Sequence, residues 1–555
     1  MSQKQELKWY GWGLENKTFD LSRRHNFWPY LREKLELKDS ETSPNSLPVN
    51  LSDIKITPKD TNLAAKFEKL LSKDQVRSDD LARITRSMGK SFPDLTRIRK
   101  GLIENPPDLV VYPKTENQVL EILQLASDLK IAVIPFGGGT SVVGGVEALK
   151  SSGQAAAISL DLSLLNQLVN IDEISLLATI QAGILGPALE KALQAQGYTL
   201  GHYPQSFEFS SLGGWIAARS AGQQSNKYGR VEDMVSSVTL ASPKELITTL
   251  DAPASAAGPS IKQMLIGSEG IFGVITKAKM RIHHMPTIKI YRGILFKDFL
   301  AGAQAIRTII QAGLNPATIR LSDETETSAI MKMRAESESM LENALSKAGK
   351  WYLKNRGYSN STCLMILGFE STDKSVKQEI KAALDICKHH DGIDLGTRVG
   401  QHWYRERFEL PYLRDTLLDY SIMIDTLETA TTWANLANLY NSVKSALTLS
   451  IESFGFRAVV FCHISHSYHD GASLYFTFLT KQTKGSELEQ WQVIKSTASD
   501  AIIADGGTIS HHHGVGRDHA KWAEREHGKL AMTALASVKQ IFDPQGILNP
   551  GKIIS

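Results

Sequence analysis

The stretch "IAVIPFGGGTSVVGG" (131–145) joins a short apolar run to a loop of small residues. Its first six residues predict a buried strand, and Gly137, Gly138 and Gly139 follow directly. Because glycine has no Cβ, its backbone can adopt positive φ angles and approach a ligand closely. Successive N–H groups in such a loop form a concave anion site, for which a pyrophosphate is the natural guest. For three glycines alone, a tight structural turn remains the other interpretation.

The loop fits neither of the two common phosphate-binding fingerprints. It is not a GxGxxG motif, and no Lys-Ser/Thr pair follows to make a P-loop. Two more stretches of small residues lie downstream, "PQSFEFSSLGGWIAARSAGQQSNKYGRVEDMV" (204–235) and "IGSEGIFGVIT" (266–276). Three such stretches in one domain favour one extended ligand over three unrelated turns.

Strands and helices alternate around the loop as far as about residue 286. A strand is predicted within 107–115, and a helix over 116–130, where apolar residues recur at helical spacing. From Ile288 a second unit of β-α-β passages begins, and 457–481 predicts a strand, a turn and another strand. This pattern indicates an α+β protein.

Composition excludes several classes of protein. The 555 residues carry a net charge of +3 with no long basic block, so we expect no nucleic-acid partner. The three cysteines are scattered, so we expect neither a disulfide framework nor a cysteine zinc site. With no signal-peptide pattern, no run of 18 apolar residues and no C-terminal SKL-type peroxisomal signal, we expect a cytoplasmic protein. Peripheral contact with a membrane stays open.

The three small-residue stretches occur in an order that resembles the flavin-contact segments of the vanillyl-alcohol oxidase type, or PCMH-type, FAD-binding fold. "ILNPGK" (547–552) is similar to a common ending of that family. The resemblance covers about 105–555 and implies two subdomains of an FAD-binding domain, an α+β cap with an antiparallel sheet, and a helical C-terminal segment. The implied divisions are an N-terminal, mostly helical or irregular segment (1–104), the FAD-binding domain (105–286), the cap or substrate domain (287–500) and a segment returning to the FAD site (501–555).

The resemblance also implies which residues bind FAD. The expected contacts come from four short segments: Ile134, Pro135, Phe136, Gly137, Gly138, Gly139, Thr140 and Ser141; Gln205, Ser206, Phe207, Glu208, Phe209, Ser210 and Ser211; Ala218, Arg219, Ser220, Ala221 and Gly222; and Gly267, Ser268, Glu269, Gly270, Ile271, Phe272 and Gly273. Covalent members of the family place a histidine in the glycine loop, where this chain has Gly139 or Thr140. We therefore expect non-covalent FAD.

Within the family, four segments resemble the alkyldihydroxyacetonephosphate synthases: "LKWYGWG" (7–13), "SMGKSFPDLTRIRKG" (87–101), "HSYHDGASLYF" (466–476) and "SHHHGVG" (510–516). D-2-hydroxy-acid dehydrogenases usually show one histidine in an EHG-type run and an HxGDGN-type strand, which this chain lacks. Ala254 stands where an arginine is expected in the eukaryotic synthases, and the sequence at 424–426 also differs from that of the synthases. An FAD-linked dehydrogenase of a D-2-hydroxy acid or related alcohol therefore remains the alternative, followed by a flavoprotein that only binds.

The synthase resemblance implies a redox-neutral exchange of an acyl chain for an alkyl chain on dihydroxyacetone phosphate. Its partners would be lipid-like small molecules, acyl-dihydroxyacetone phosphate and a fatty alcohol, and a homodimer is expected by analogy. Arg414, and as a second candidate Arg320, would bind the substrate phosphate, because a guanidinium fork suits phosphate oxygens. The other reading of each arginine is a surface or interface ion pair.

Tyr468 and the run His511, His512 and His513 are the expected catalytic residues. If the run is extended, His511 and His513 face one side and His512 the other. Neighbouring cations would help the tyrosine lose a proton. A metal site built from the run and His463, His466, His469 and His519 is the rival reading, and purely structural turn histidines are another. The predicted site contains no metal, because three adjacent histidines have poor spacing for chelation.

Overall fold

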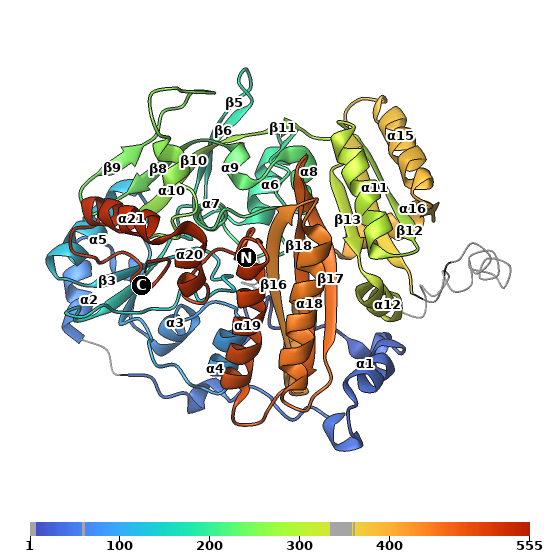
Figure 1. Cartoon of the computed structure of the whole chain (residues 1–555). Helices are drawn as coiled ribbons and strands as arrows, with labels where there is room; N and C mark the ends of the chain where they lie inside the picture. The colour runs from blue at the N-terminus through green and yellow to red at the C-terminus, as the bar shows by residue number, and fades with distance from the viewer. Residues whose placement is uncertain (1–6, 58–60, 334–357, 359–360, 555) are drawn as a thin grey trace.

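The strand that enters the glycine loop lies at the edge of a four-stranded sheet, in the order β1-β2-β4-β3. The computed structural model describes residues 7–57, 61–333, 358 and 361–554 (Figure 1). The strands are β1 (Val76–Arg77), β2 (Leu109–Val111), β3 (Ala132–Phe136) and β4 (Ala157–Asp161), the last three parallel. A crossover connection joins parallel strands, and α5 (Glu116–Asp128) carries the chain from β2 to β3, on the far side of β4.

A five-stranded antiparallel sheet carries the other two small-residue stretches. Its order is β5-β6-β10-β8-β9, and a separate pair, β7 with β11, lies beside it. The strands are β5 (Leu168–Asp172), β6 (Leu177–Gln181), β7 (Tyr198–Thr199), β8 (Val235–Ala241), β9 (Leu246–Thr248), β10 (Val274–Arg281) and β11 (His283–His284). The helices of this region are short: α6 (Gly186–Gln194), α7 (Leu212–Ala217), α8 (Ser225–Tyr228), α9 (Val231–Met234) and α10 (Ile261–Leu265).

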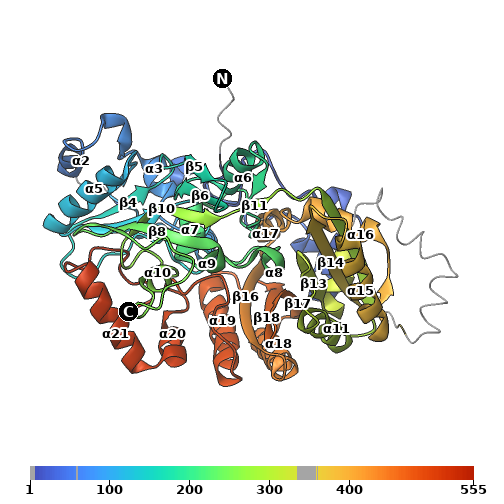
Figure 2. The same cartoon turned by 90° about the horizontal axis from the view of Figure 1, so that it is seen from above.

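The predicted second unit is a seven-stranded, fully antiparallel sheet, in the order β15-β12-β14-β13-β17-β18-β16. Its strands are β12 (Ile288–Phe296), β13 (Thr318–Ser322), β14 (Cys363–Ser371), β15 (Ile393–Asp394), β16 (Ile422–Thr432), β17 (Val459–Ser467) and β18 (Gly471–Lys481). The helices are α11 (Phe299–Gln311), α12 (Glu324–Lys332), α15 (Val376–His389), α16 (Thr397–Glu406), α17 (Leu410–Asp419), α18 (Leu436–Glu452) and α19 (Glu487–Ala504). Figure 2 shows α11, α15 and α18 on one face of this sheet and α16 and α17 on the other.

Alternation along these strands separates a hydrophobic core from a functional face. In β17 and β18, Cys462, Ile464, Phe476 and Phe478 pack into the core beneath α11 and α18. Their neighbours point to the opposite face, because successive strand side chains alternate. That face is directed toward the half of the molecule that carries the glycine loop. The sheet is therefore a wall for whatever the loop binds.

The two ends of the described chain connect the halves. The N-terminal segment contains α1 (Phe27–Leu35), α2 (Thr61–Phe67), α3 (Asp80–Thr85) and α4 (Phe92–Arg99), with short 3-10 turns at Leu21–Arg23, Asp39–Glu41, Leu51–Asp53 and Lys73–Gln75. The Trp12 N–H donates to Asp415 of α17 at 2.6 Å. At the other end, α20 (Ala520–His527) and α21 (Lys529–Phe542) lead back to β3, where Leu548 forms a parallel bridge with Val133.

Two details differ from the sequence predictions. The division after residue 500 falls inside α19, which is one unbroken helix to Ala504. The run 510–513 forms bends instead of an extended strand. The remaining divisions stay predictions. In the described ranges, no helix combines the length and apolar character required to cross a membrane.

Candidate active site

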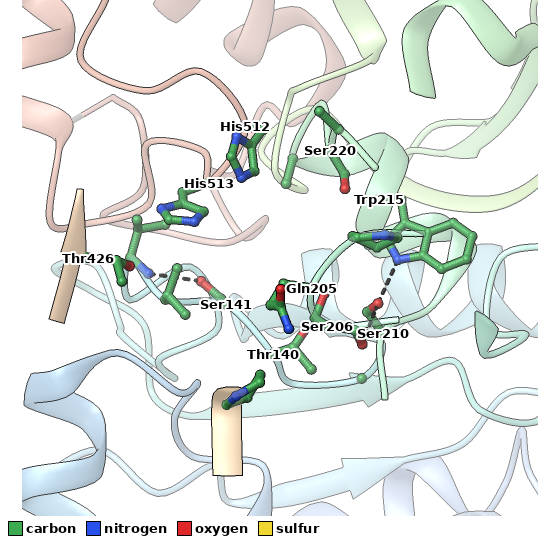
Figure 3. A pocket seen from close by; sticks show the side chains of 18 of the residues that line it. Thr140, Ser141, Gln205, Ser206, Ser210, Trp215, Ser220, Thr426, His512 and His513 are labelled. Carbon is green, nitrogen blue, oxygen red and sulfur yellow. Dashed lines mark hydrogen bonds between the residues drawn. The ribbon is translucent and has the colours of Figure 1, made fainter. Parts of the chain in front are cut away.

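A cavity of about 420 Å³ lies between the glycine loop and the seven-stranded sheet. Loops 135–146, 204–221 and 269–275 line one side, and β13, β16, β17 and β18 line the other, with the histidine run between them. Figure 3 shows His512 and His513 on one side of the cavity, Trp215 and Ser210 on the other, and Gln205 between them. A large, mostly apolar cavity with a few converging polar groups is the usual form of a cofactor and substrate site.

The glycine loop presents unused donors to this cavity. Within the described structure, no backbone N–H from Gly137 to Val142 donates to a protein acceptor. A Cβ on Gly138 would lie 1.8 Å from the Phe209 carbonyl oxygen, so only glycine fits there. Free successive N–H groups form a nest for an anion, which is what the pyrophosphate of FAD requires. The residues present therefore fit this group.

Most of the predicted FAD-contact residues line the cavity. They are Pro135, Phe136, Gly137, Gly138, Gly139, Thr140, Ser141, Gln205, Ser206, Ser210, Ser211, Ala218, Ser220, Ala221, Glu269, Gly270 and Gly273. The cofactor-binding role of each stays a prediction.

The other predicted contacts do not line the cavity, and their placement explains why. Ile134, Phe207, Ile271 and Phe272 belong to hydrophobic cores. The Arg219 guanidinium donates to the Gln263 and Ile266 carbonyl oxygens and thus points away from the cavity. Glu208, Phe209, Gly222, Gly267 and Ser268 are likewise absent from the lining. A contiguous segment cannot direct every side chain to one ligand.

Glu269 and Asn549 close the glycine loop from the C-terminal side. The Glu269 carboxylate accepts the Val515 and Gly516 N–H groups at 2.5 and 2.7 Å, and its burial raises the pKa to about 7. The Asn549 amide donates to the Glu269 and Gly145 carbonyl oxygens at 2.7 and 3.1 Å. Its Oδ1 is buried and has no partner in the described structure, so it offers the cavity a free acceptor. Asn549 was not among the predicted site residues, although it lies in "ILNPGK".

The histidine run is held by one buried carboxylate, Glu428 of β16. The Glu428 carboxylate accepts the backbone N–H groups of His511, His512 and His513 at 2.5, 2.9 and 2.7 Å, and the Ser510 hydroxyl at 2.8 Å. Converging donors wrap the run around one acceptor, which prevents the alternation expected of an extended run. His512 and His513 line the cavity, and His511 lies behind them. Because the run is not extended, the alternation that would place His511 and His513 on one face does not apply.

Burial disfavours the charged form of each imidazole in the run. Burial lowers the pKa of His513 to about 3, although Glu428 opposes the shift. Burial, with His466 and His512 nearby, places the His511 pKa well below its usual value. For His512 burial again lowers the pKa, against the opposing effect of Glu428. Each ring is therefore available as one donor and one acceptor.

A different tyrosine from the predicted one faces the cavity. Tyr475 lines it, stacks on His463 at 4.8 Å and contacts the rings of His512 and His513. Tyr468 is not part of the lining, and its hydroxyl bonds to His511 Nε2 at 2.5 Å. Burial raises the pKa of both tyrosines to about 12. The Arg230 cation lowers the pKa of Tyr468, as expected of a neighbouring cation, but burial outweighs it.

A β-bulge in β17 lies between the part of the strand that lines the cavity and Tyr468. The pairing of β17 with β18 shifts register between Ile464 and Ser467, so Ser465 and His466 both reach the cavity. An extra residue in one strand reverses the alternation beyond it. Tyr475 lies on the regular side of the bulge, directly opposite Glu428 in β16.

Both predicted arginines line the cavity, each partly engaged by protein. Arg414 donates from Nη1 to the Lys90 carbonyl at 2.6 Å, and its buried Nε has no partner in the described structure. Arg320 donates from Nη2 to Glu326 at 2.9 Å and lies 3.2 Å from His463 Nδ1. Burial raises the Glu326 pKa, but His463 and Arg320 together hold it low, at about 2, so Glu326 is ionised. Arg414 is thus the arginine with the free buried donor.

One part of the cavity wall, which we call the apolar arm, is formed by apolar side chains. These side chains come from the N-terminal segment, α12, α17 and the functional face of the sheet: Trp12, Phe27, Ala329, Ile330, Met333, Leu413, Phe461 and Leu479. Trp12 and Phe27 are 4% and 1% exposed, although they lie in a segment expected to be an irregular lead-in. This arm was not localised from the sequence, because its residues come from four separate segments.

Among the described residues, the candidate metal site consists of His466, His511 and His512. One ring nitrogen of each lies within 4.8 Å of the others. These rings already bond to protein: His466 Nδ1 to Ser225 Oγ at 2.7 Å, His511 Nε2 to Tyr468, and His511 Nδ1 to His512 Nδ1 at 3.0 Å. His463 pairs with Glu326, His519 bonds to the Gly514 carbonyl, and His469 is exposed.

Comparison with known proteins agrees with this geometry. Residues 107–251 match the FAD binding domain family, and residues 285–553 match the C-terminal domain of FAD linked oxidases. The fold and the site thus define an FAD-binding protein of the FAD-linked oxidase class, with FAD as its cofactor.

Closer relatives specify the family. An alkyldihydroxyacetonephosphate synthase of Dictyostelium discoideum is 34% identical, covering 99% of this chain and 94% of its own length. One of Caenorhabditis elegans is 30% identical over 99% and 95%. A solved alkyldihydroxyacetonephosphate synthase structure superposes with a TM-score of 0.83 at 32% identity, covering 98% of each chain. The chain belongs to the alkyldihydroxyacetonephosphate synthase family.

Proposed function

We propose that this chain replaces the acyl chain of acyl-dihydroxyacetone phosphate with the alkyl chain of a fatty alcohol, as the first step that forms an ether lipid. The observation that carries the proposal is the composition of the cavity wall. It combines the glycine loop, two arginines and several histidines with a group of apolar side chains, the apolar arm. A small hydroxy acid would need no such arm.

The arginines suit the phosphate end of the substrate. A dianion leaving water must be paired, and a guanidinium offers it two parallel donors. Arg414 has a buried Nε without a protein partner, and Arg320 is anchored by Glu326 and His463. Arg414 would take the phosphate directly, and Arg320 would add a positive field nearby.

The apolar arm suits the chains. Each buried methylene contributes about 0.8 kcal/mol of transfer free energy, so a long chain supplies much of the binding. Phe27, Ile330, Met333 and Leu479 present only carbon and sulfur to this arm. A carboxylate or hydroxyl of a small acid would gain nothing there.

Protons must move, because the alcohol loses its hydroxyl proton and the acid leaves as a carboxylate. The balanced exchange gives alkyl-dihydroxyacetone phosphate, a carboxylate and one proton. FAD, when bound, supplies a redox-active ring that can take and return electrons within one turnover, so no outside oxidant is consumed. Tyr475 and His512 line the cavity and would hold or pass the proton. We propose Tyr475, in place of Tyr468, as the tyrosine in contact with substrate.

The test combines pure, flavin-loaded protein with palmitoyl-dihydroxyacetone phosphate and labelled hexadecanol. Labelled alkyl product without an electron acceptor is expected. Bleaching of the flavin by D-lactate or another hydroxy acid, with no alkyl product, would favour the dehydrogenase alternative. Acid precipitation should leave the yellow cofactor in the supernatant, as expected of non-covalent FAD. The homodimer and contact with a membrane stay predictions from the resemblance.

A further inference from the structure

We propose that His512, His511 and Tyr468 form a proton relay from the cavity to the surface turn between β17 and β18. The relay rests on the proposed function, which releases one proton per turnover inside a largely enclosed site. It also gives Tyr468 a role different from direct contact with substrate.

The three groups form an unbroken hydrogen-bonded chain. His512 lines the cavity, and its side chain is 14% exposed. Its Nδ1 lies 3.0 Å from Nδ1 of His511, and the opposite nitrogen of that ring, Nε2, lies 2.5 Å from the Tyr468 hydroxyl. Both separations are within hydrogen-bonding distance. A proton entering His511 at one nitrogen can therefore leave from the other.

The tautomers of the two imidazoles decide which atom of each hydrogen bond carries the proton. A neutral imidazole has one N–H donor and one acceptor nitrogen. Before transfer, His512 Nδ1–H donates to His511 Nδ1, and His511 Nε2–H donates to the Tyr468 oxygen. After His512 Nε2 has taken a proton from the cavity and Tyr468 has released its own outward, Tyr468 donates to His511 Nε2, and His511 Nδ1–H donates to His512 Nδ1. The two arrangements differ by the net movement of one proton from the cavity side to the outer side of the phenol.

The outer end of the chain reaches solvent. Tyr468 is partly exposed and begins the turn whose next residues, His469 and Asp470, are exposed. The turn is fixed, because the Tyr468 N–H donates to the Gly471 carbonyl at 2.8 Å and Trp433 Nε1 donates to the Tyr468 carbonyl at 3.1 Å. The phenol is thus held beside an exposed turn, with its hydroxyl bonded to His511.

The surroundings keep His511 in place and disfavour a trapped proton. The ring of His466 stacks on it at 4.9 Å, Arg230 donates to its carbonyl at 3.2 Å, and Glu428 accepts its N–H. Burial of His511, the neighbouring imidazoles and the Arg230 cation all lower the His511 pKa and so oppose an imidazolium there. A proton would therefore pass through this ring without resting on it.

The test measures turnover of flavin-loaded Tyr468→Phe, which keeps the ring and removes the hydroxyl. We expect kcat to fall about tenfold, less than the roughly 10²–10⁴-fold lost with a group that transfers a proton to substrate directly. The solvent deuterium isotope effect should rise, and KM for both substrates should not change. In Tyr468→Ala, added imidazole should restore part of the rate, since a small proton carrier can replace the phenol. Tyr440→Phe, which removes a phenol that bonds to Asp323 and does not line the cavity, should retain the parent rate.

A second readout does not depend on turnover. In 15N-histidine spectra of the flavin-loaded protein, Tyr468→Phe should shift the ring signals of both His511 and His512, because the tautomers are coupled. A shift confined to His511, an unchanged rate and isotope effect, or a loss that imidazole does not restore would overturn the relay. So would a stoichiometric transition metal on the purified protein, because the same nitrogens would be its ligands. Failure of the parent protein to make alkyl product overturns the proposed function alone, since the spectra still report on the chain.

Discussion

The direction in which a side chain leaves its strand decides which tyrosine faces the cavity. Tyr468 and Tyr475 lie in one segment, "HSYHDGASLYF", and only the structure shows which of the two side chains faces the cavity. Tyr475 points into the cavity, and Tyr468 lies beyond a bulge. Strand alternation could have been predicted from the apolar partners Leu474, Phe476 and Phe478, but a bulge leaves no reliable mark in a sequence.

Tyr475→Phe should reduce kcat by roughly 10²–10⁴-fold, because the hydroxyl that contacts the reacting groups is removed. The flavin content and the melting temperature should stay near those of the parent protein, since the ring keeps its stack on His463. Initial rates of alkyl product formation provide the measurement. A variant that retains more than half of the parent rate would contradict the role of Tyr475.

Among elements, the connection between the histidine run and β16 was invisible in the sequence. Glu428 lies more than eighty residues before the run and has no motif of its own, yet its carboxylate collects four donors from Ser510 to His513. The run itself could be predicted as part of a flavin site, because it accompanies the small-residue stretches. Its shape could not, because a single distant acceptor imposes it.

Glu428→Gln should destabilise the protein by about 2–3 kcal/mol, because an amide supplies one acceptor oxygen where the buried donors need two charged ones. Burial raises the Glu428 pKa, but the neighbouring histidines and N–H donors shift it downward overall, so the carboxylate is charged in the parent protein. Urea unfolding measures the difference. The matched control is Glu526→Gln, an exposed carboxylate that accepts the Ile509 N–H, where we expect less than about 1 kcal/mol. Equal losses for both variants would contradict a special role for Glu428.

The glycine loop is the element that the sequence predicted best. Its strand, its small residues and its companion stretches are local features, and they indicated FAD before any contact was known. Gly138 packs closely against the Phe209 carbonyl, a tertiary contact that the sequence did not reveal. This contact predicts the effect of an added side chain at residue 138.

Gly138→Ala should yield folded protein with little or no bound FAD, because the added Cβ forces the loop away from residues 209–211. The absorbance ratio of flavin to protein measures occupancy. The comparison variant is Gly153→Ala, a glycine in a nearby loop whose Cβ would meet no atom, although its φ of +85° makes it mildly strained. Full FAD occupancy in Gly138→Ala would contradict the assignment of the loop.

For the whole molecule, the order of the motifs predicted the two-part α+β architecture, whereas the meeting of distant segments at the cavity required the structure. Four distant regions of the chain contribute to the cavity wall or hold the residues that line it, through Trp12, Arg414, Glu428 and Asn549. Long-range contacts of this kind depend on packing of the complete chain. The same packing buries an unusual number of imidazoles, which gives the molecule a pH response.

Stability should fall as the pH drops from 7 to 5. Burial lowers the pKa of several histidines: His202, His283, His463, His466, His511, His512, His513 and His519. In the unfolded chain they take up protons near pH ~6.5, so the unfolded state binds more protons below that value and is favoured. Carboxyl groups whose pKa burial raises oppose the trend: Asp94, Glu208, Glu232, Glu269, Asp323, Asp419 and Asp518. Among them the pKa reaches about 7 for Glu269 and Asp518. Thermal unfolding at constant ionic strength measures the trend, and a melting temperature that rises toward pH 5 would contradict the neutral histidine cluster.

The central claim is a redox-neutral exchange at the flavin, and counting its products tests it most directly. Flavin-loaded protein is given palmitoyl-dihydroxyacetone phosphate and hexadecanol in the absence of oxygen, with a dye present that would change colour on accepting electrons. We predict one palmitate released for each hexadecyl product formed, with no reduction of the dye. Dye reduced in step with substrate consumed, or palmitate released without hexadecyl product, would contradict the account.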